Sequence, residues 1–301
     1  MDYCSVKETA GKWGISERSV RNYCAQGRID GALLVGKTWH IPADAQKPER
    51  ANARPKRPLV DVLRAERAGG VHGGIYHRLQ VDMAFNSNHI EGSTLTHEQT
   101  RHIFETATIG LEADGVVRVD DVIEAANHFR AFDYMLDHVS HRITCAMIKE
   151  LHRLLKQGTS DAAKDWFRVG AWKAYPNEVG GRATTPSDEV DARMRVLLGG
   201  YEGLEEYGFD DLLDFHVRFE RIHPFQDGNG CVGRLLLFKE CLRWEMVPFL
   251  IGEDLKLFYY RGLARWDQER GWLRDTCLTA QDAMKEVLGA FKIDAPSPGR
   301  N

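Results

Sequence analysis

The residues best suited to chemistry lie together in one short segment, residues 223–234, with the sequence HPFQDGNGCVGR. Apolar periodicity predicts a helix that ends at Ile222 and a second helix that begins near Cys231, so the segment joins two helices. Glycines just before a helix leave backbone N–H groups free to surround an anion, and the helix dipole favours negative charge there. We therefore expect Gly228 and Gly230 to contribute to a phosphate-binding site.

Three side chains of the same segment add to this phosphate chemistry. Asp227 is suited to hold a divalent cation on the phosphates, and Arg234, one turn into the second helix, to pair with a terminal phosphate. His223 is the only group of the segment that titrates near neutrality, so it is the natural general base. A glycine-rich turn capped by an aspartate is the simpler alternative, but it leaves most of these residue types unexplained.

The segment also contains the pattern GxGxxG, at Gly228, Gly230 and Gly233. In dinucleotide-binding folds this pattern follows an apolar strand and precedes an acidic residue by about twenty positions. Here the preceding residues, FHVRFERIHPFQD, are charged and have helical periodicity. We therefore reject the dinucleotide interpretation.

At these positions the chain resembles the Fic family, whose motif is HPFx(D/E)GNGRxxR. The matching residues are His223, Pro224, Phe225, Asp227, Gly228, Asn229, Gly230 and Arg234. The resemblance covers most of residues 59–290 and implies a mainly helical Fic core with a β-hairpin flap. It implies that the core binds ATP and Mg²⁺ and transfers AMP to a Ser, Thr or Tyr hydroxyl of a target protein.

The resemblance also assigns roles by position. His223 would be the base that deprotonates the target hydroxyl, Phe225 would anchor the loop in the core, and Asp227 would hold Mg²⁺. The remaining positions would bind the nucleotide: Gly228, Asn229 and Gly230 at the α- and β-phosphates, and Arg234 at the γ-phosphate.

One motif position departs from the family, because Cys231 stands where the first arginine after GNG is expected. The loss of a phosphate contact would weaken ATP affinity or orientation, or would accompany the use of a different nucleotide. A cysteine at a helix N-terminus can have a lowered pKa and a redox role. The simpler expectation is a passive thiol, since free cysteine usually behaves as a small hydrophobic residue.

A second segment, SNHIEG at residues 87–92, resembles the family's inhibitory pattern (S/T)xxxE(G/N) through Ser87, Glu91 and Gly92. Glu91 could form an ion pair with Arg234, which would remove the partner of the γ-phosphate and place negative charge in its position. The alternative is a glutamate near a helix end, just before Thr96 caps the next helix.

Two further segments resemble parts of the family's site. Residues 171–185, with Pro-Asn and Gly-Gly punctuation, are predicted to form a hairpin and resemble the flap that pairs with a target segment; an ordinary surface hairpin is the alternative. Residues 257–268 resemble the nucleotide-side helix, where Tyr260 would contact adenine or simply pack in the core. Asp267 lies where relatives often place Asn, and His216 is expected to serve packing.

The first 45 residues have a different pattern: a capping box, a short helix, a tight turn at Gly14, a second helix and a hairpin around Gly36. They resemble the excisionase/MerR-like class and predict a winged helix-turn-helix domain at residues 1–45. Arg18, Arg21 and Asn22 would meet the major groove of DNA and Lys37 the backbone. A protein-interaction or dimerisation module is the alternative.

The charge distribution supports a separate N-terminal module. Residues 1–60 carry eleven Lys or Arg and six Asp or Glu, whereas the whole chain of 301 residues has a net charge of −4. Residues 46–58 hold three prolines and five basic residues and are predicted to be a linker. We expect the Fic domain at residues 59–293 and a flexible tail at 294–301.

The elements that must position the site are predicted to be helices. Apolar periodicity indicates amphipathic helices at residues 120–139, 144–155, 188–198, 209–222, 231–245 and 254–266. The composition, 43% hydrophobic and 28% charged, is that of a globular protein. The sequence indicates no transmembrane helix, signal peptide or CxxC pair, so we expect a cytoplasmic protein without disulfide or zinc framework.

These observations predict a protein adenylyltransferase that is autoinhibited by Glu91 and carries a DNA-binding module. Three alternatives stay open: removal of AMP from a modified protein by the same site, a nucleotide-sensing DNA-binding regulator with little transferase activity, and use of UTP or GTP as donor. The resemblance also implies self-association, but the sequence indicates no interface.

Overall fold

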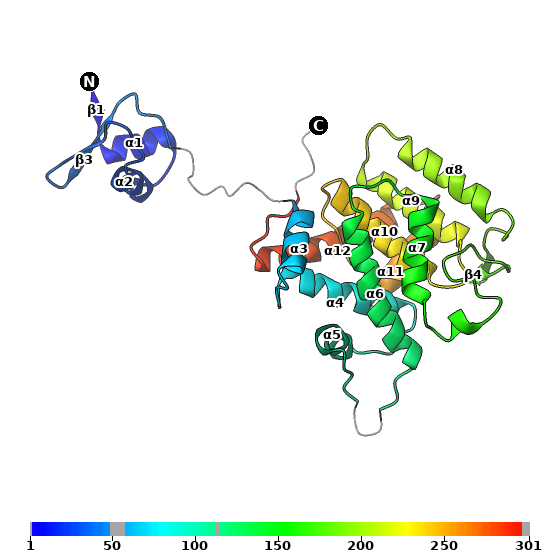
Figure 1. The fold of residues 1–301 in the computed structure, drawn as a ribbon. Helices are drawn as coiled ribbons and strands as arrows, with labels where there is room; N and C mark the ends of the chain where they lie inside the picture. Colours follow the sequence, from blue (N-terminus) through cyan, green and yellow to red (C-terminus); the bar gives the residue numbers. More distant parts are fainter. Residues whose placement is uncertain (1, 49–57, 112–114, 297–301) are drawn as a thin grey trace. The chain divides into compact units, whose positions relative to one another are not determined.

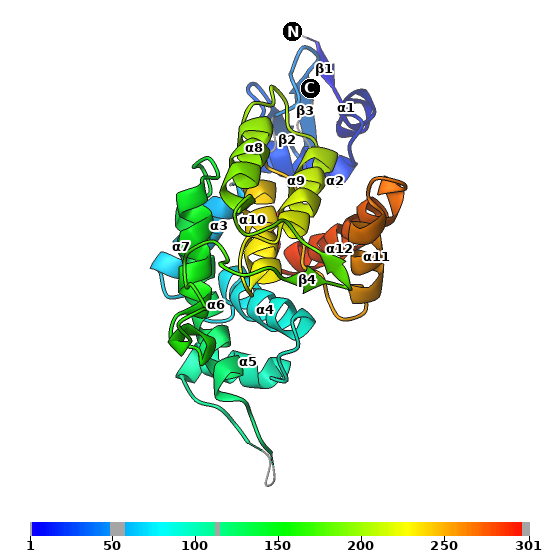
Figure 2. The ribbon, with the colours of Figure 1, turned by 90° about the vertical axis from the view of Figure 1, so that its right-hand side faces the viewer.

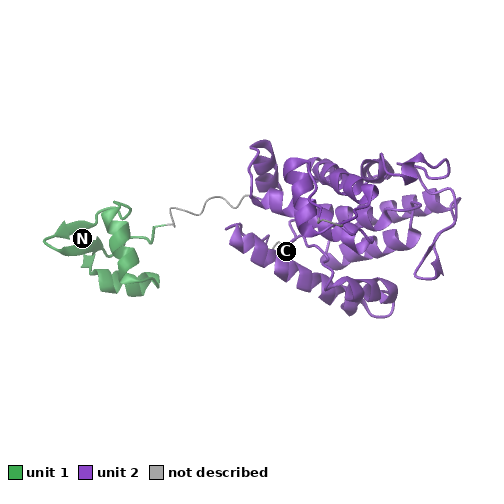
Figure 3. Ribbon diagram, turned by 90° about the horizontal axis from the view of Figure 1, so that it is seen from below, with its two compact units in different colours: residues 1–56 green, residues 57–301 purple. Residues whose placement is uncertain are grey.

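The computed structural model describes residues 2–48, 58–111 and 115–296 and divides the chain into two compact units, Met1–Lys56 and Arg57–Asn301 (Figure 3). Most of the predicted linker at 46–58 and of the predicted tail at 294–301 lies outside the described residues.

The N-terminal unit combines two helices with a small sheet. Its elements are β1 (Tyr3–Cys4), α1 (Val6–Trp13), α2 (Glu17–Ala25), β2 (Leu33–Val35) and β3 (Thr38–Pro42), and the strand order is β1-β3-β2 with antiparallel pairing. Ser5 and Glu8 form a capping box at the start of α1. Gly14 ends α1 with a φ of 61°, in the left-handed region that glycine tolerates best.

A small core of its own holds this unit together. Val20 from α2 and Ile41 from β3 are fully buried within it. Burial of Val20 and Cys24 turns the opposite face of α2 toward solvent. The four residues predicted to contact DNA are all exposed there or on the hairpin: Arg18, Arg21, Asn22 and Lys37.

The second unit is mainly helical, in agreement with the predicted fold class (Figure 1). Its helices are α3 (Leu59–Ala68), α4 (Ile75–Ile90), α5 (His97–Thr106), α6 (Val119–Asp137), α7 (Cys145–Lys156), α8 (Val190–Glu202), α9 (Phe209–Ile222), α10 (Asn229–Arg243), α11 (Lys256–Arg265) and α12 (Arg270–Ala290), with a short 3₁₀ turn at Asp161–Ala163. No helix among the described residues is apolar over a length sufficient to cross a membrane.

Helix α10 lies at the centre of this unit and packs against α4, α6, α7 and α9 (Figures 1 and 2). Every residue from Asn229 to Leu242 is buried. A helix that is covered on all sides needs apolar residues around its circumference, and α10 supplies them. The expectation of an amphipathic helix at 231–245 is therefore wrong.

Two neighbouring charged residues in the middle of α10 are buried with the rest of the helix. Lys239 and Glu240 are 0% and 1% exposed, and the lysine Nζ lies 2.6 Å from Glu240 Oε1. Lys239 also donates to the carbonyl of His141, and Glu240 accepts from the Tyr201 hydroxyl at 2.8 Å and from Trp244 Nε1 at 3.0 Å. Buried charges are tolerated when they are paired and hydrogen-bonded in this way.

The other predicted helices differ from the observed ones mainly at their ends. Helix α9 spans the predicted 209–222, whereas α12, the longest helix, has no counterpart in the prediction. The predicted hairpin at 171–185 contains β4 (Glu178–Val179) and β5 (Arg182–Ala183), which pair antiparallel across Gly180 and Gly181. Its strands have two residues each, so most of that segment is irregular.

The buried charge cluster on α10 yields a stability prediction. Glu240→Ala would leave Lys239 as an uncompensated buried charge, so we expect the free energy of unfolding to fall by about 3–5 kcal/mol. Asp282→Ala, which removes an exposed ion pair with Lys285, is the matched control and should cost less than about 1 kcal/mol. Urea denaturation followed by circular dichroism measures both, and equal small losses would contradict the assigned role.

Candidate active site

The loop between α9 and α10 is defined by two residues in the left-handed region. His223 ends α9 with a φ of 50°, and Gly228 begins α10 with a φ of 77°. A Cβ atom at Gly228 would lie 2.9 Å from Cε of Lys156, so both the backbone and the neighbouring side chain favour glycine there. The free N–H groups of the first turn of α10 therefore open onto this loop.

Asn229 closes the loop on itself. Its Oδ1 accepts a hydrogen bond from the backbone N–H of Phe225 at 2.8 Å, and its Nδ2 donates to the Phe225 carbonyl at 2.9 Å. Because both ends of the buried amide are engaged, its side chain has a loop-shaping role. Any contact of Asn229 with phosphate would have to come from its backbone.

Phe225 lies inside the core. It is fully buried, and its ring stacks on His152 with the centroids 3.9 Å apart and an interplanar angle of 2°. Trp172 packs against the other part of the ring at 5.2 Å. This packing fixes the loop between its two flanking helices.

Helix α7 supports the loop through a histidine that the sequence analysis did not identify. His152 Nδ1 accepts from the Gly170 N–H at 2.9 Å, so in the neutral ring Nε2 carries the proton and donates to the Asp227 carbonyl at 3.2 Å. Burial lowers the pKa of His152 to about 4 and keeps the ring neutral. The available signal in the sequence was the spacing of His152 and Lys156, because residues four positions apart lie on the same face of a helix.

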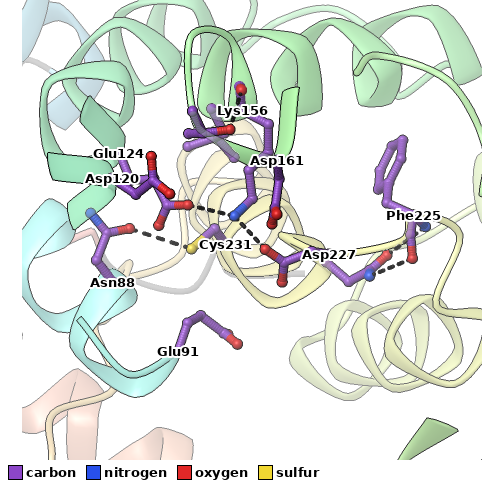
Figure 4. A network of polar contacts seen from close by, with 12 residues as sticks. Asn88, Glu91, Asp120, Glu124, Lys156, Asp161, Phe225, Asp227 and Cys231 are labelled. Atoms are coloured by element: carbon purple, nitrogen blue, oxygen red, sulfur yellow. Dashed lines mark hydrogen bonds and ion pairs between the residues drawn. The ribbon is translucent and has the colours of Figure 1, made fainter. Parts of the chain in front are cut away.

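Lys156 holds the carboxylate of Asp227 (Figure 4). The lysine side chain is only 8% exposed, and its Nζ also lies 2.6 Å from Oε1 of Glu124 on α6. Desolvation opposes ionisation of Asp227, but the Lys156 ammonium and the N–H of Gly228 outweigh it and lower the pKa of Asp227. Asp227 is therefore an anion at neutral pH.

The donors at this point fit a magnesium ion that also binds phosphate. The side chain of Asp227 is 51% exposed, so its carboxylate can be reached from outside. Within the described part of the chain, no group of three or more His, Cys, Asp or Glu side chains could hold a metal alone. Mg²⁺ commonly takes one or two carboxylates and completes its shell with water and substrate phosphates, which suits a single exposed aspartate.

His223 is a neutral imidazole at neutral pH. Burial lowers the pKa of His223 below its ordinary value of 6.5, and the Lys173 ammonium acts in the same direction. Its Nδ1 lies 3.3 Å from the Glu220 carbonyl. If Nδ1 donates to that carbonyl, Nε2 is the nitrogen left to accept a proton.

The hairpin segment is attached to the same loop. The Lys173 N–H donates to the Pro224 carbonyl at 2.9 Å, and Asn177 Nδ2 donates to the Phe225 carbonyl at 3.0 Å. The Lys173 ammonium in turn donates to Oδ1 of Asn177 at 2.6 Å and to the Thr184 hydroxyl. The segment that leads into β4 is thus tied to the two loop residues that follow His223.

Arg234 faces the end of α4. Its Nη2 lies 2.7 Å from Glu91 Oε1 and donates to the Ser87 carbonyl at 2.9 Å, while its Nε donates to the Ser87 hydroxyl at 3.0 Å. The guanidinium is 6% exposed. Desolvation opposes its charge, but Glu91 outweighs this effect and raises the pKa of Arg234. The structure therefore brings the predicted residues Ser87, Glu91 and Arg234 together.

Glu91 lies directly over the first turn of α10. A Cβ atom at Gly230 would lie 2.0 Å from its Oε1, so only glycine leaves room for the carboxylate. Glu91 caps the C-terminus of α4, and Gly92 continues the chain with a φ of 98°. One carboxylate oxygen therefore lies beside Gly230 at the start of α10.

Cys231 is buried beneath this carboxylate. It is 7% exposed, and its Sγ contacts Oδ1 of Asn88 at 3.5 Å (Figure 4). Burial raises the pKa of Cys231 to about 11, although the Arg234 guanidinium acts in the opposite direction. The thiol is therefore protonated at neutral pH, and the lowered pKa considered for it is wrong.

The remaining predicted residues are His216 on α9, Tyr260 on α11 and Asp267, which follows α11. Tyr260 is 41% exposed, and burial of the rest of the ring raises its pKa to about 12. His216 is buried and meets the hydroxyl of Tyr259 through Nε2, a packing role. Asp267 is bound to Arg221 by two contacts of 3.0 and 2.9 Å.

Comparisons with known proteins agree with this geometry. Residues 142–240, which include the loop, match the model of the Fic/DOC family. The chain is 24% identical over 213 residues to protein adenylyltransferase fic-1 of Caenorhabditis briggsae, covering 68% of this chain and 41% of that protein. It is 28% identical over 193 residues to protein adenylyltransferase Fic of Drosophila willistoni, covering 60% and 35%. The chain thus spans about two fifths or less of these curated relatives.

Solved structures show the fold. A Fic domain-containing signaling protein from Bacteroides thetaiotaomicron superimposes with a TM-score of 0.61 at 22% identity, covering 80% of this chain and 99% of that one. Fic-1 of C. elegans (residues 134–508) superimposes with a TM-score of 0.60 at 20% identity, covering 77% and 71%. Residues 142–240 thus match the Fic/DOC family, and the second unit has the fold of these solved Fic structures.

Proposed function

We propose that this protein transfers AMP from ATP to a hydroxyl side chain of a target protein. The observation that supports the proposal is the loop between α9 and α10, which carries a neutral His223 and an ionised Asp227 directly before the first turn of α10. The names of the relatives support the same reaction.

In the proposed reaction the hydroxyl oxygen of a Ser, Thr or Tyr attacks the α-phosphorus of ATP. His223 accepts the hydroxyl proton, the bond between the α-phosphorus and the bridging oxygen breaks, and pyrophosphate leaves. The N–H groups at the start of α10 stabilise the charge on the phosphate oxygens. When bound at Asp227, Mg²⁺ would add positive charge to the phosphates.

The hairpin would present the target to this base. Its attachment to the carbonyls of Pro224 and Phe225 keeps β4 and β5 beside His223. An extended target segment could add to the exposed edge of this two-stranded sheet by main-chain pairing. Tyr260 would contact the adenine with the exposed part of its ring.

Glu91 would hold the enzyme in a resting state. Its carboxylate occupies the anion-binding face beside Gly230 and takes the guanidinium that the γ-phosphate would need. ATP must therefore displace an existing ion pair and overcome the repulsion of a like charge. The same carboxylate could instead orient water for the reverse reaction, the removal of AMP from a modified target. Release of AMP from such a target would reveal that activity.

A second function is proposed for the N-terminal unit, which would bind DNA through α2. The exposed Arg18, Arg21 and Asn22 on one face support it, because such side chains contact bases and phosphates in the major groove. A regulator that binds DNA and only senses nucleotide stays an alternative to the transferase. The missing arginine at Cys231 favours that alternative.

Labelling with radioactive ATP tests the transfer of AMP and its inhibition by Glu91. With α-labelled ATP and Mg²⁺, we expect Glu91→Gly to label itself or proteins of a cell lysate more strongly than wild type. Glu91→Gly/His223→Ala should bind ATP but produce no label, because the proton acceptor is gone. Equal labelling of wild type and Glu91→Gly would reject autoinhibition. Label in the double variant would remove His223 from the base role.

Failure of all variants to label, despite measurable ATP binding, would favour the nucleotide-sensing regulator. Cys231→Arg in the Glu91→Gly background is the matched test of the missing cation. Recovery of label in that variant would show that the cysteine disables transfer, and parallel reactions with labelled UTP and GTP would identify another donor.

The pKa of His223 predicts the pH dependence of transfer. A base works in its neutral form, and burial lowers the pKa of His223 below 6.5. The kcat/KM of the Glu91→Gly variant should therefore fall less between pH 7.5 and 6.5 than it would with a histidine of ordinary pKa, and it should be halved only below pH 6.5. Loss of half the rate near pH 7 would contradict the assignment.

DNA binding by the full chain is tested by its salt dependence. Binding to duplex DNA should weaken with rising salt, and Arg18→Ala should reduce the slope by about one if this residue contacts a phosphate. Arg195→Ala, an exposed arginine on α8 paired with Asp191, is the matched control and should leave the slope unchanged. Identical slopes for wild type and Arg18→Ala would place any DNA contact elsewhere.

A further inference from the structure

The Lys156 ammonium lies at the meeting point of three elements. The lysine lies at the end of α7, Asp227 lies in the loop between α9 and α10, and Glu124 lies on α6 (Figure 4). Nζ contacts a carboxylate oxygen of each acid, and the lysine side chain is 8% exposed. The stem cannot swing aside freely, because Cε and Cγ pack on Gly228.

This arrangement resembles that of a bound cation. The distance of 2.6 Å between Nζ and Glu124 Oε1 falls at the upper end of the range for calcium–oxygen contacts and above that for magnesium. An ammonium carries one positive charge, where a divalent ion would carry two. The lysine therefore satisfies both carboxylates in the absence of a metal, but it leaves one negative charge uncompensated.

We propose that Lys156 is a positioning residue that occupies the cation position between Asp227 and Glu124, so that a divalent ion binds to Asp227 only together with nucleotide phosphates. The proposal rests on the proposed function, which makes Asp227 the metal ligand. Without nucleotide, a metal ion would have to displace the Lys156 ammonium from Asp227. In return it would gain only one exposed carboxylate as a ligand. Nucleotide phosphates add oxygen ligands for the metal ion and further negative charge. They therefore favour the presence of the metal ion and of the Lys156 ammonium at the same time.

The test is a calorimetric titration of the nucleotide-free full chain with Mn²⁺. Lys156→Gln keeps a long polar side chain but removes the charge, and we expect it to raise the Mn²⁺ affinity by about tenfold or more. Lys164→Met, which removes an equal charge from an exposed pair with Asp161, is the matched control and should leave the affinity unchanged. Lys156→Gln/Asp227→Asn should lose the gain.

An unchanged affinity in a folded Lys156→Gln variant would overturn the proposal, as would a gain that survives Asp227→Asn. Glu124→Gln tests it with the lysine in place. The ammonium would then neutralise Asp227 alone, so the Mn²⁺ affinity of the ADP complex should fall by about threefold or more. A rise in that affinity would overturn the proposal even if Lys156→Gln did not fold.

These measurements are independent of AMP transfer. A chain that labels its target while Lys156→Gln leaves the Mn²⁺ affinity unchanged would keep the proposed function and reject the role of the lysine. A chain that binds Mn²⁺ as expected but never transfers AMP would support the role of the lysine and reject the proposed function.

Discussion

The burial of α10 on every side is the constraint on which the rest of the structure depends. The first turn of this helix is part of the candidate site, and the following turns form the centre of the core. Its surroundings therefore fix the site: α9 delivers His223, α7 holds both the carbonyl and the carboxylate of Asp227, and α4 ends against Arg234. A loop built on such a helix has few ways to move as a whole, which suits a site that must hold phosphates in one orientation.

The site has a balance of charge that becomes clear only in three dimensions. Positive charge comes from Arg234 and Lys156, and each already contacts a carboxylate, Glu91 for the arginine and Asp227 with Glu124 for the lysine. Such pairing lets both cations stay buried without nucleotide. It also means that ATP would compete with resident anions at one end of the site. At the other end, a metal would compete with a resident cation.

Much of this site could be predicted from the sequence, because its residues are close together along the chain. The motif at 223–234 identified the loop, and the pattern at 87–92 identified the glutamate that meets Arg234. His152, Lys156 and Glu124 could not be found in this way, since they lie on α6 and α7 and reach the loop only through packing. The polarity of α10 was misjudged because Lys239 and Glu240 neutralise each other inside the core.

The place of Glu91 in its helix also affects how the site can open. It is the capping residue of α4, held by backbone hydrogen bonds to the last turn from its own N–H and that of Gly92. Helix ends fray at little cost, whereas interior turns exchange their amide protons only in rarer openings. In α4 the last turn is itself buried, so its unwinding would withdraw the carboxylate but would also expose Ser87 and Ile90, which are 1% and 4% exposed. Release of Glu91 by local unfolding would therefore also loosen the contacts of this turn with Arg234 and with the core.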